Sequence, residues 1–146
     1  MKSLKQSVFL GVLALLMLTG CSATGPKFAE LESTSVSPTP GQGRIYIYRK
    51  PGLVGAAVQP KVYLNDEQVG VAKPGGFTFA DRAPGNYEVK VSTEVKRTAS
   101  FTLEAGQTRY VRLEISMGFF VGHVYPTLVD SKEGAEEIQA CSYATE

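Results

Sequence analysis

The chain has 146 residues, with 15 basic side chains, 14 acidic side chains and a formal net charge of +1. This length is enough for one domain of ordinary size and not for two. The near balance of charge supplies no basic face of the kind that nucleic-acid-binding proteins need, so we expect no nucleic-acid partner.

The first 20 residues have the three-part layout of a secretory signal peptide. Lys2 and Lys5 make the start positive, and residues 8–18 form an apolar stretch that only Gly11 interrupts. This stretch is too short to cross a bilayer, since a transmembrane helix needs about 20 apolar residues. We therefore expect residues 1–20 to be a signal peptide, and not a buried helix of a cytoplasmic domain.

The end of this segment, Leu18-Thr19-Gly20-Cys21, resembles the lipobox of bacterial lipoproteins. The resemblance implies cleavage between Gly20 and Cys21, a diacylglyceryl group on the Cys21 thiol and an acylated new amino terminus. Several acyl chains on one residue anchor a protein stably, whereas a single chain does not. Ser22, and not Asp, follows the cysteine, which by resemblance to enterobacterial sorting favours the periplasmic side of the outer membrane, with the inner membrane as the alternative.

The next segment, residues 21–43, is expected to be the lipidated amino terminus followed by a flexible linker. It is rich in Ser, Thr, Pro and Gly, most clearly over residues 33–41, and such a composition buries too little apolar surface to offset the entropy of ordering. A flexible linker of about 22 residues would reach roughly 25 Å. The alternative for Phe28, Ala29 and Leu31 is one helical turn or a docking contact with the domain.

From residue 44 onward, apolar residues recur with a period of two, which is typical of β-strands. Ile45 and Ile47 alternate with Tyr46 and Tyr48. The same alternation occurs around Val62, Val69, Phe77, Val89, Phe101 and Val111, and turn residues separate the runs at 65–66, 74–76, 83–86 and 105–106. We predict that residues 44–146 form an all-β domain, a compact antiparallel β-sandwich of about seven or eight strands.

A short helix is expected near the carboxyl end. Asp130 and Glu133 have the spacing of a capping box, and Ala135, Ile138 and Cys141 could form one apolar side. A glycine inside this segment, Gly134, weakens the prediction, because glycine costs about 1 kcal/mol relative to alanine in a helix interior.

A family resemblance is carried by four stretches of this sequence: residues 43–49, 62–66, 84–87 and 105–111. Together they resemble a family of small bacterial lipoproteins whose domain has no assigned function and is distantly similar to PEGA and carboxypeptidase-regulatory β-sandwich modules. The resemblance covers roughly residues 43–140. It implies a fold but transfers no catalytic residue.

The residues suited to chemistry are few, and we expect no catalytic site, no metal and no cofactor. His123 is the only histidine, and it lies in a segment that reads as strand or loop packing. A structural zinc site needs four ligands, whereas the chain after Cys21 offers His123 and Cys141. Acylation of Cys21 would leave Cys141 without a disulfide partner, and we expect Cys141 to be a buried, inert thiol.

Two aromatic groups are candidate binding surfaces. Tyr46, Tyr48 and Tyr63 could share one face as a platform for a glycan, because tyrosine combines an apolar ring with a polar tip. Phe119, Phe120 and Tyr125 would form a partner surface if they were exposed. Core packing is the favoured interpretation of both groups.

The sequence therefore predicts a lipid-anchored envelope lipoprotein that acts as a non-catalytic interaction module. Its partners would be the membrane, through the lipid anchor, and an envelope protein or the cell wall. The alternative is a module that binds peptidoglycan or another glycan. An enzyme ranks last.

Overall fold

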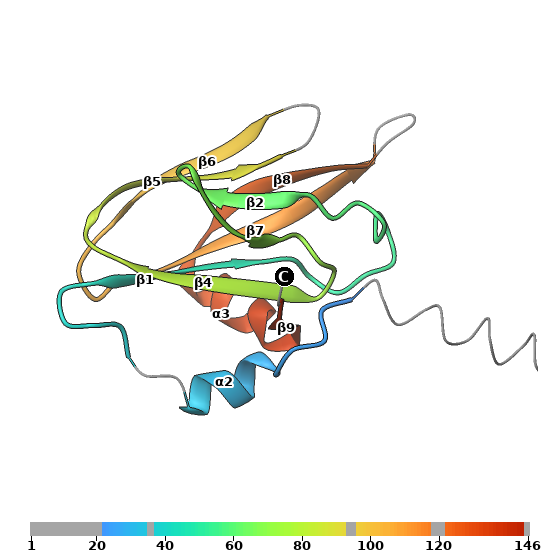
Figure 1. Cartoon of the computed structure of the whole chain (residues 1–146). Coiled ribbons are helices and arrows are strands. Elements are labelled where there is room, and N and C mark those ends of the chain that lie inside the picture. Colours follow the sequence, from blue (N-terminus) through green and yellow to red (C-terminus); the bar gives the residue numbers. More distant parts are fainter. Residues whose placement is uncertain (1–21, 35–36, 93–95, 118–121, 145–146) are drawn as a thin grey trace, which may run out of the picture.

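The computed structural model of the chain describes residues 22–34, 37–92, 96–117 and 122–144. Most of this part consists of two β-sheets that pack on each other through a shared apolar core (Figure 1). The strand order is β8-β7-β1-β4-β9 in the five-stranded sheet and β3-β2-β5-β6 in the four-stranded sheet. The predictions of an all-β sandwich and of a short helix near the carboxyl end are confirmed.

The described strands are β1 (Gly43–Tyr48), β2 (Lys61–Leu64), β3 (Glu67–Val71), β4 (Gly76–Arg82), β5 (Gly85–Val91), β6 (Arg97–Leu103), β7 (Thr108–Met117), β8 (Gly122–Val129) and β9 (Ser142–Tyr143). The described helices are α2 (Phe28–Thr34), α3 (Ser131–Glu137) and the 3₁₀-helix η2 (Ile138–Ala140). None of these helices combines the length and the apolar character that crossing a bilayer would require.

The five-stranded sheet is mixed, which corrects the expectation of a purely antiparallel sandwich. Strand β1 pairs antiparallel with β4 on one side and parallel with β7 on the other, where Arg44 lies opposite Thr108. Strand β9 also pairs parallel, with β4. A parallel pair needs a long crossover, and here the chain forms the whole four-stranded sheet between β1 and β7.

The five-stranded sheet is covered on both faces, so all six residues of β1 are buried. Ile45 and Ile47 point into the core between the sheets. Tyr46 and Tyr48 point to the opposite face, where a second, aromatic core lies beneath the helices. The buried members of this second core are Phe28, Tyr46, Tyr48, Phe77, Tyr110, Ile138 and Cys141.

Part of the segment expected to be a flexible linker is instead packed on the domain. The ring of Phe28 is only 3% exposed and makes edge-to-face contacts with Tyr46 and Phe77 at 5.3 and 5.2 Å between ring centroids. The backbone is also tied down, because the Gly25 and Phe28 N–H groups donate to carbonyl groups of Tyr143 and Cys141. One large apolar side chain and a neighbouring strand edge thus order a segment whose average composition suggests disorder.

Helix α3 begins where the sequence predicts. The Asp130 carboxylate accepts hydrogen bonds from the backbone N–H groups of Lys132 and Glu133, at 2.9 and 3.0 Å, as an N-cap residue does. Gly134 is buried against Tyr110, and a Cβ atom at this position would lie 2.3 Å from the ring carbon Cγ. The glycine that is unfavourable for the isolated helix therefore lets the helix approach the sheet.

Candidate functional site

The candidate site lies at the end of β1, where the chain enters the loop of residues 49–60. Arg49 is only 3% exposed, and its guanidinium donates hydrogen bonds to backbone carbonyl groups within this loop and to that of Ala72, just after β3. The acceptors are the carbonyl oxygens of Val58 at 2.7 Å, Ala72 at 2.8 Å, Gly55 at 2.8 Å and Val54 at 3.4 Å. Burial lowers the pKa of Arg49, and among the described residues no ion pair includes this side chain. Arg49 therefore acts as an internal brace for the loop.

The braced loop holds two apolar side chains in solvent. Leu53 is 93% exposed and Val54 is 64% exposed. Backbone hydrogen bonds from Ala56 to Leu53 and from Val58 to Gly55 tighten the loop behind them. Leu53 and Val54 thus form an apolar tip that the hydrogen bonds of the loop hold in a defined position.

An open hollow of about 400 Å³ lies between this loop and β7. It is lined by Arg49, Lys50, Pro51, Gly52, Val54, Arg112, Leu113, Glu114 and Ile115. Because the wall combines apolar side chains with charged groups of both signs, the hollow is suited to a surface contact more than to one charged ligand.

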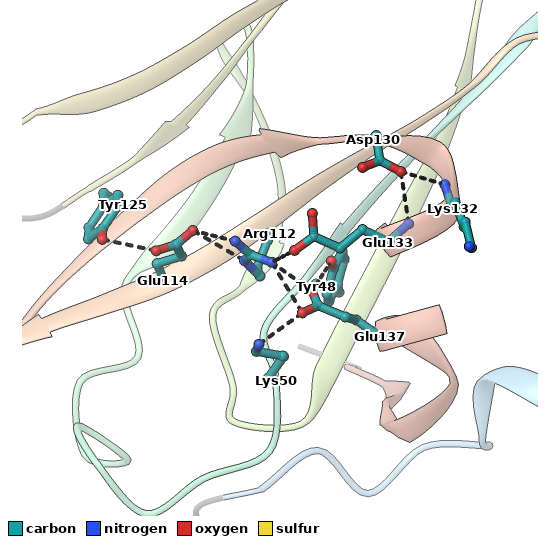
Figure 2. A network of polar contacts seen from close by, with 9 residues as sticks. All are labelled: Tyr48, Lys50, Arg112, Glu114, Tyr125, Asp130, Lys132, Glu133 and Glu137. Carbon is teal, nitrogen blue, oxygen red and sulfur yellow. Dashed lines mark hydrogen bonds and ion pairs between the residues drawn. The ribbon is translucent and has the colours of Figure 1, made fainter. Parts of the chain in front are cut away.

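Arg112 lies at the centre of a charge cluster beside the hollow (Figure 2). Its guanidinium donates to Glu114 at 2.9 Å, to Glu137 at 3.0 Å and to Glu133. Glu137 also accepts a hydrogen bond of 2.6 Å from the Tyr48 hydroxyl and pairs with Lys50 at 2.9 Å. Strand β7 supplies Arg112 and Glu114, whereas helix α3 supplies the other two carboxylates, so the cluster fastens the helix to the sheet.

Within this cluster, the pKa values of Glu137, Glu114 and Tyr48 are shifted away from neutral pH. Burial raises the pKa of Glu137, but hydrogen bonds from Tyr48, Lys50 and Arg112 outweigh burial and hold the pKa at about 2. The pKa of Glu114 is also lowered. Burial acts to raise it, but hydrogen bonds from Arg112 and Tyr125 outweigh burial. The pKa of Tyr48 is raised, mainly by burial and to a smaller extent by the hydrogen bond to Glu137. A proton-transfer group would need a pKa near the working pH, so these shifts fit a structural cluster.

Cys141, the second cysteine of the chain, is fully buried, as expected. Burial raises the pKa of its thiol to about 12, and its Sγ atom lies 3.5 Å from the Arg49 carbonyl oxygen. The reactive form of cysteine is the thiolate, so this environment makes Cys141 inert. Within the described ranges, no group of three or more His, Cys, Asp or Glu side chains is placed to hold a metal ion.

The three tyrosines of the candidate glycan platform do not form a common surface. Tyr46 and Tyr48 are 8% and 0% exposed, and the helical segments cover them. Tyr63 lies on β2 in the other sheet, with Lys90 5.5 Å from its ring centroid. Alternation along one strand correctly predicts a shared face for Tyr46 and Tyr48, but it cannot show that β1 and β2 belong to different sheets.

The candidate partner surface is described only at Tyr125, because Phe119 and Phe120 lie outside the described residues. Gly20 and Cys21 of the lipobox also lie outside them. Tyr125 is half-buried on β8, and its hydroxyl donates to Glu114 at 3.0 Å. It therefore joins the charge cluster. His123 is half-buried on the same strand, opposite Ser116 of β7.

Sequence reasoning missed Arg49, Arg112 and the Leu53–Val54 tip. The tip carried a signal, since two large apolar residues stand between Pro51-Gly52 and Gly55, where a solvent-facing loop would ordinarily be polar. The two arginines carried none. Their partners are distant in sequence, with Glu137 25 residues from Arg112 and Ala72 23 residues from Arg49.

The fold and this site define a small mixed β-sandwich whose larger sheet carries a second, aromatic core under short helices. The chain belongs to the family described as "Protein of unknown function (DUF2846)", whose model matches residues 39–124. This range runs from just before β1 into β8. The expectation of a domain of unknown function is thereby confirmed. Neither the curated proteins nor the solved structures gave a match to the chain.

Proposed function

We propose that the protein is a lipid-anchored lipoprotein of the bacterial envelope, held at the periplasmic face of the outer membrane. The observation that carries this proposal is the sequence Leu18-Thr19-Gly20-Cys21 at the end of an apolar stretch that follows Lys2 and Lys5. Support also comes from the position of the folded domain, which is in contact with the chain from Ala23 onward. The lipobox thus immediately precedes the domain that it would anchor.

The anchor is tested by replacing its cysteine. In cells grown with labelled palmitate, the wild-type chain should incorporate label, and Cys21→Ser should incorporate none and accumulate as uncleaved precursor. Cys141→Ala is the matched control, since it removes the other cysteine from a buried position, and it should keep the label. Normal membrane retention of Cys21→Ser without label would refute the anchor.

For the anchored domain, we propose a non-catalytic interaction role. The lowered pKa values of Glu137 and Glu114 and the raised pKa values of Tyr48 and Tyr125 support this role, because they lie away from neutral pH. Among the described strands, β6 is the edge best suited to a partner. It has seven residues and pairs only with β5, whereas β8, at an edge of the other sheet, contains Pro126, which has no N–H group for pairing. β8 of the other sheet packs against β6 without pairing with it, and an extended partner segment can add to a sheet edge of this kind.

Photo-crosslinking in intact cells tests the interaction. A photoreactive amino acid at Ser100, an exposed position of β6, should give a discrete adduct with one envelope protein. The same amino acid at Ala29, an exposed position of α2, is the control and should give no such adduct. Identical patterns at both positions, or no adduct at Ser100, would contradict the use of this edge.

A further inference from the structure

The point at which the lipid anchor would join the domain is closely defined. The Ala23 N–H donates to the Pro74 carbonyl at 3.2 Å, and the Gly25 N–H donates to Tyr143 at 3.1 Å. Two residues of extended chain span at most about 7 Å, so an acylated Cys21 stays within that distance of Ala23. The domain surface around Ala23 would therefore lie against the bilayer, without the long reach of a flexible linker.

The turn that receives Ala23 also contacts the loop of residues 49–60. The Gly75 N–H donates to the Lys50 carbonyl at 3.3 Å, and a Cβ atom at Gly75 would lie 3.4 Å from the ring of Pro51. Figure 1 shows the start of the described chain and this loop at the same end of the domain. The apolar tip of Leu53 and Val54 follows Pro51 after the single residue Gly52, so it lies on the side from which the anchor emerges.

The loop is built to keep that tip exposed. The Arg49 guanidinium donates to the carbonyl groups of Val54 and Gly55, which fixes the backbone of the tip while Val54 also lines the hollow. Lys50, at the base of the loop, has a side chain that is 55% exposed. Its ammonium group pairs with Glu137 at 2.9 Å, so the apolar side chains of Leu53 and Val54 carry the argument. Exposed apolar side chains next to a lipid anchor resemble the interfacial segments of membrane-surface proteins, where apolar groups enter the headgroup boundary.

We propose that the loop of residues 51–55 is a second membrane contact, in which Leu53 and Val54 enter the interface of the bilayer that holds the acyl chains of Cys21. The inference rests on the proposed lipid anchor. The anchor supplies proximity, and the loop then fixes which side of the domain faces the lipid. The edge of β6 would be presented in a constant orientation to partners in the periplasm.

Fluorescence from one introduced cysteine tests this contact in the full-length acylated protein, which carries Cys141→Ala to remove the other free thiol and is reconstituted in vesicles of phosphatidylethanolamine and phosphatidylglycerol. Gly52→Cys is the reporter, because a side chain at Gly52 would meet nothing within 4 Å, and it leaves Leu53 and Val54 intact. Ala105→Cys is the control, since the Gly106 N–H donates to Gln42 near the opposite end of β1. Each is labelled with an environment-sensitive dye.

The dye at position 52 should show blue-shifted emission and lose fluorescence when nitroxide-bearing lipids are included. The dye at position 105 should show neither effect. Adding Leu53→Ser and Val54→Ser to the Gly52→Cys chain should restore the emission seen in water. Equal behaviour at positions 52 and 105, or quenching that survives the two serine substitutions, would overturn the inference.

Mass analysis of the amino-terminal peptide separates the two proposals. An acylated peptide together with an unquenched dye at position 52 would overturn the loop contact and leave the anchor standing. An unmodified Cys21 in the chain isolated from membranes would overturn the proposed anchor, and the loop contact with it.

Discussion

Replacing Phe28 with alanine tests directly whether the segment before β1 belongs to the folded domain. The ring is 3% exposed and is held between Tyr46 and Phe77 in the aromatic core. A flexible linker would tolerate this change without effect on stability. A docked segment would not.

The expected magnitude follows from the packing. Truncating a buried phenylalanine to alanine costs about 3–5 kcal/mol when the surroundings cannot relax. Phe28 lies in a terminal segment, which can detach locally, so the free energy of docking this segment limits the loss. We expect the free energy of unfolding to fall by about 2–3 kcal/mol, which lowers a urea midpoint by about 1–2 M at the usual slopes for small proteins.

The assay is urea unfolding followed by circular dichroism, because the chain has no tryptophan to report on the core. Ala29→Ser is the matched control, since Ala29 is exposed on the same helix, and surface changes of this kind stay within about 0.5 kcal/mol. A midpoint for Phe28→Ala that equals the midpoint of Ala29→Ser would refute the docking of this segment.

Two further predictions concern α3. Gly134→Ala should lower the urea midpoint even though alanine favours a helix by about 1 kcal/mol, because the new Cβ would lie 2.3 Å from the Tyr110 ring; an unchanged or raised midpoint would contradict this close approach. The pKa of Glu137 is about 2 in the folded chain against an ordinary 4.5, so its stabilising contribution is complete above pH 4.5 and is lost as the pH falls through 2. Between pH 5 and pH 2 the wild type should therefore lose about 1–3 kcal/mol more stability than Glu137→Gln, and equal losses in denaturation series across these pH values would disprove the contribution.

Much of the fold was predictable because its signals are local. Alternation placed Ile45 and Ile47 on one face of β1 and Tyr46 and Tyr48 on the other, and the structure confirms both faces. The hairpin turn at Asn65-Asp66 was also predicted, and Asn65 there has a positive φ of 53°. These features depend on residues two or three positions apart, so the order of amino acids is sufficient to indicate them.

The candidate site was not predictable in the same way. Arg112 appears in the sequence as a polar position in a strand. Its role depends on Glu137, which lies 25 residues later in helix α3 and reaches Arg112 only in the folded chain. Arg49 appears as the residue after a strand, and only the folded loop brings carbonyl groups to its guanidinium. Contacts of this kind require the relative placement of elements that the chain joins through long connections.

By itself, the sequence determined the lipobox pattern, the strand-forming segments, the faces of β1 and the start of the helix after Asp130. Each depends on short-range spacing or on the conformational preferences of neighbouring residues. Only the tertiary structure decided that β1 pairs in parallel with β7, that Phe28 docks, and that Gly134 is needed beside Tyr110. These outcomes depend on how apolar surfaces distant in the chain are buried together, because the free energy of that burial outweighs local preferences for disorder or against glycine.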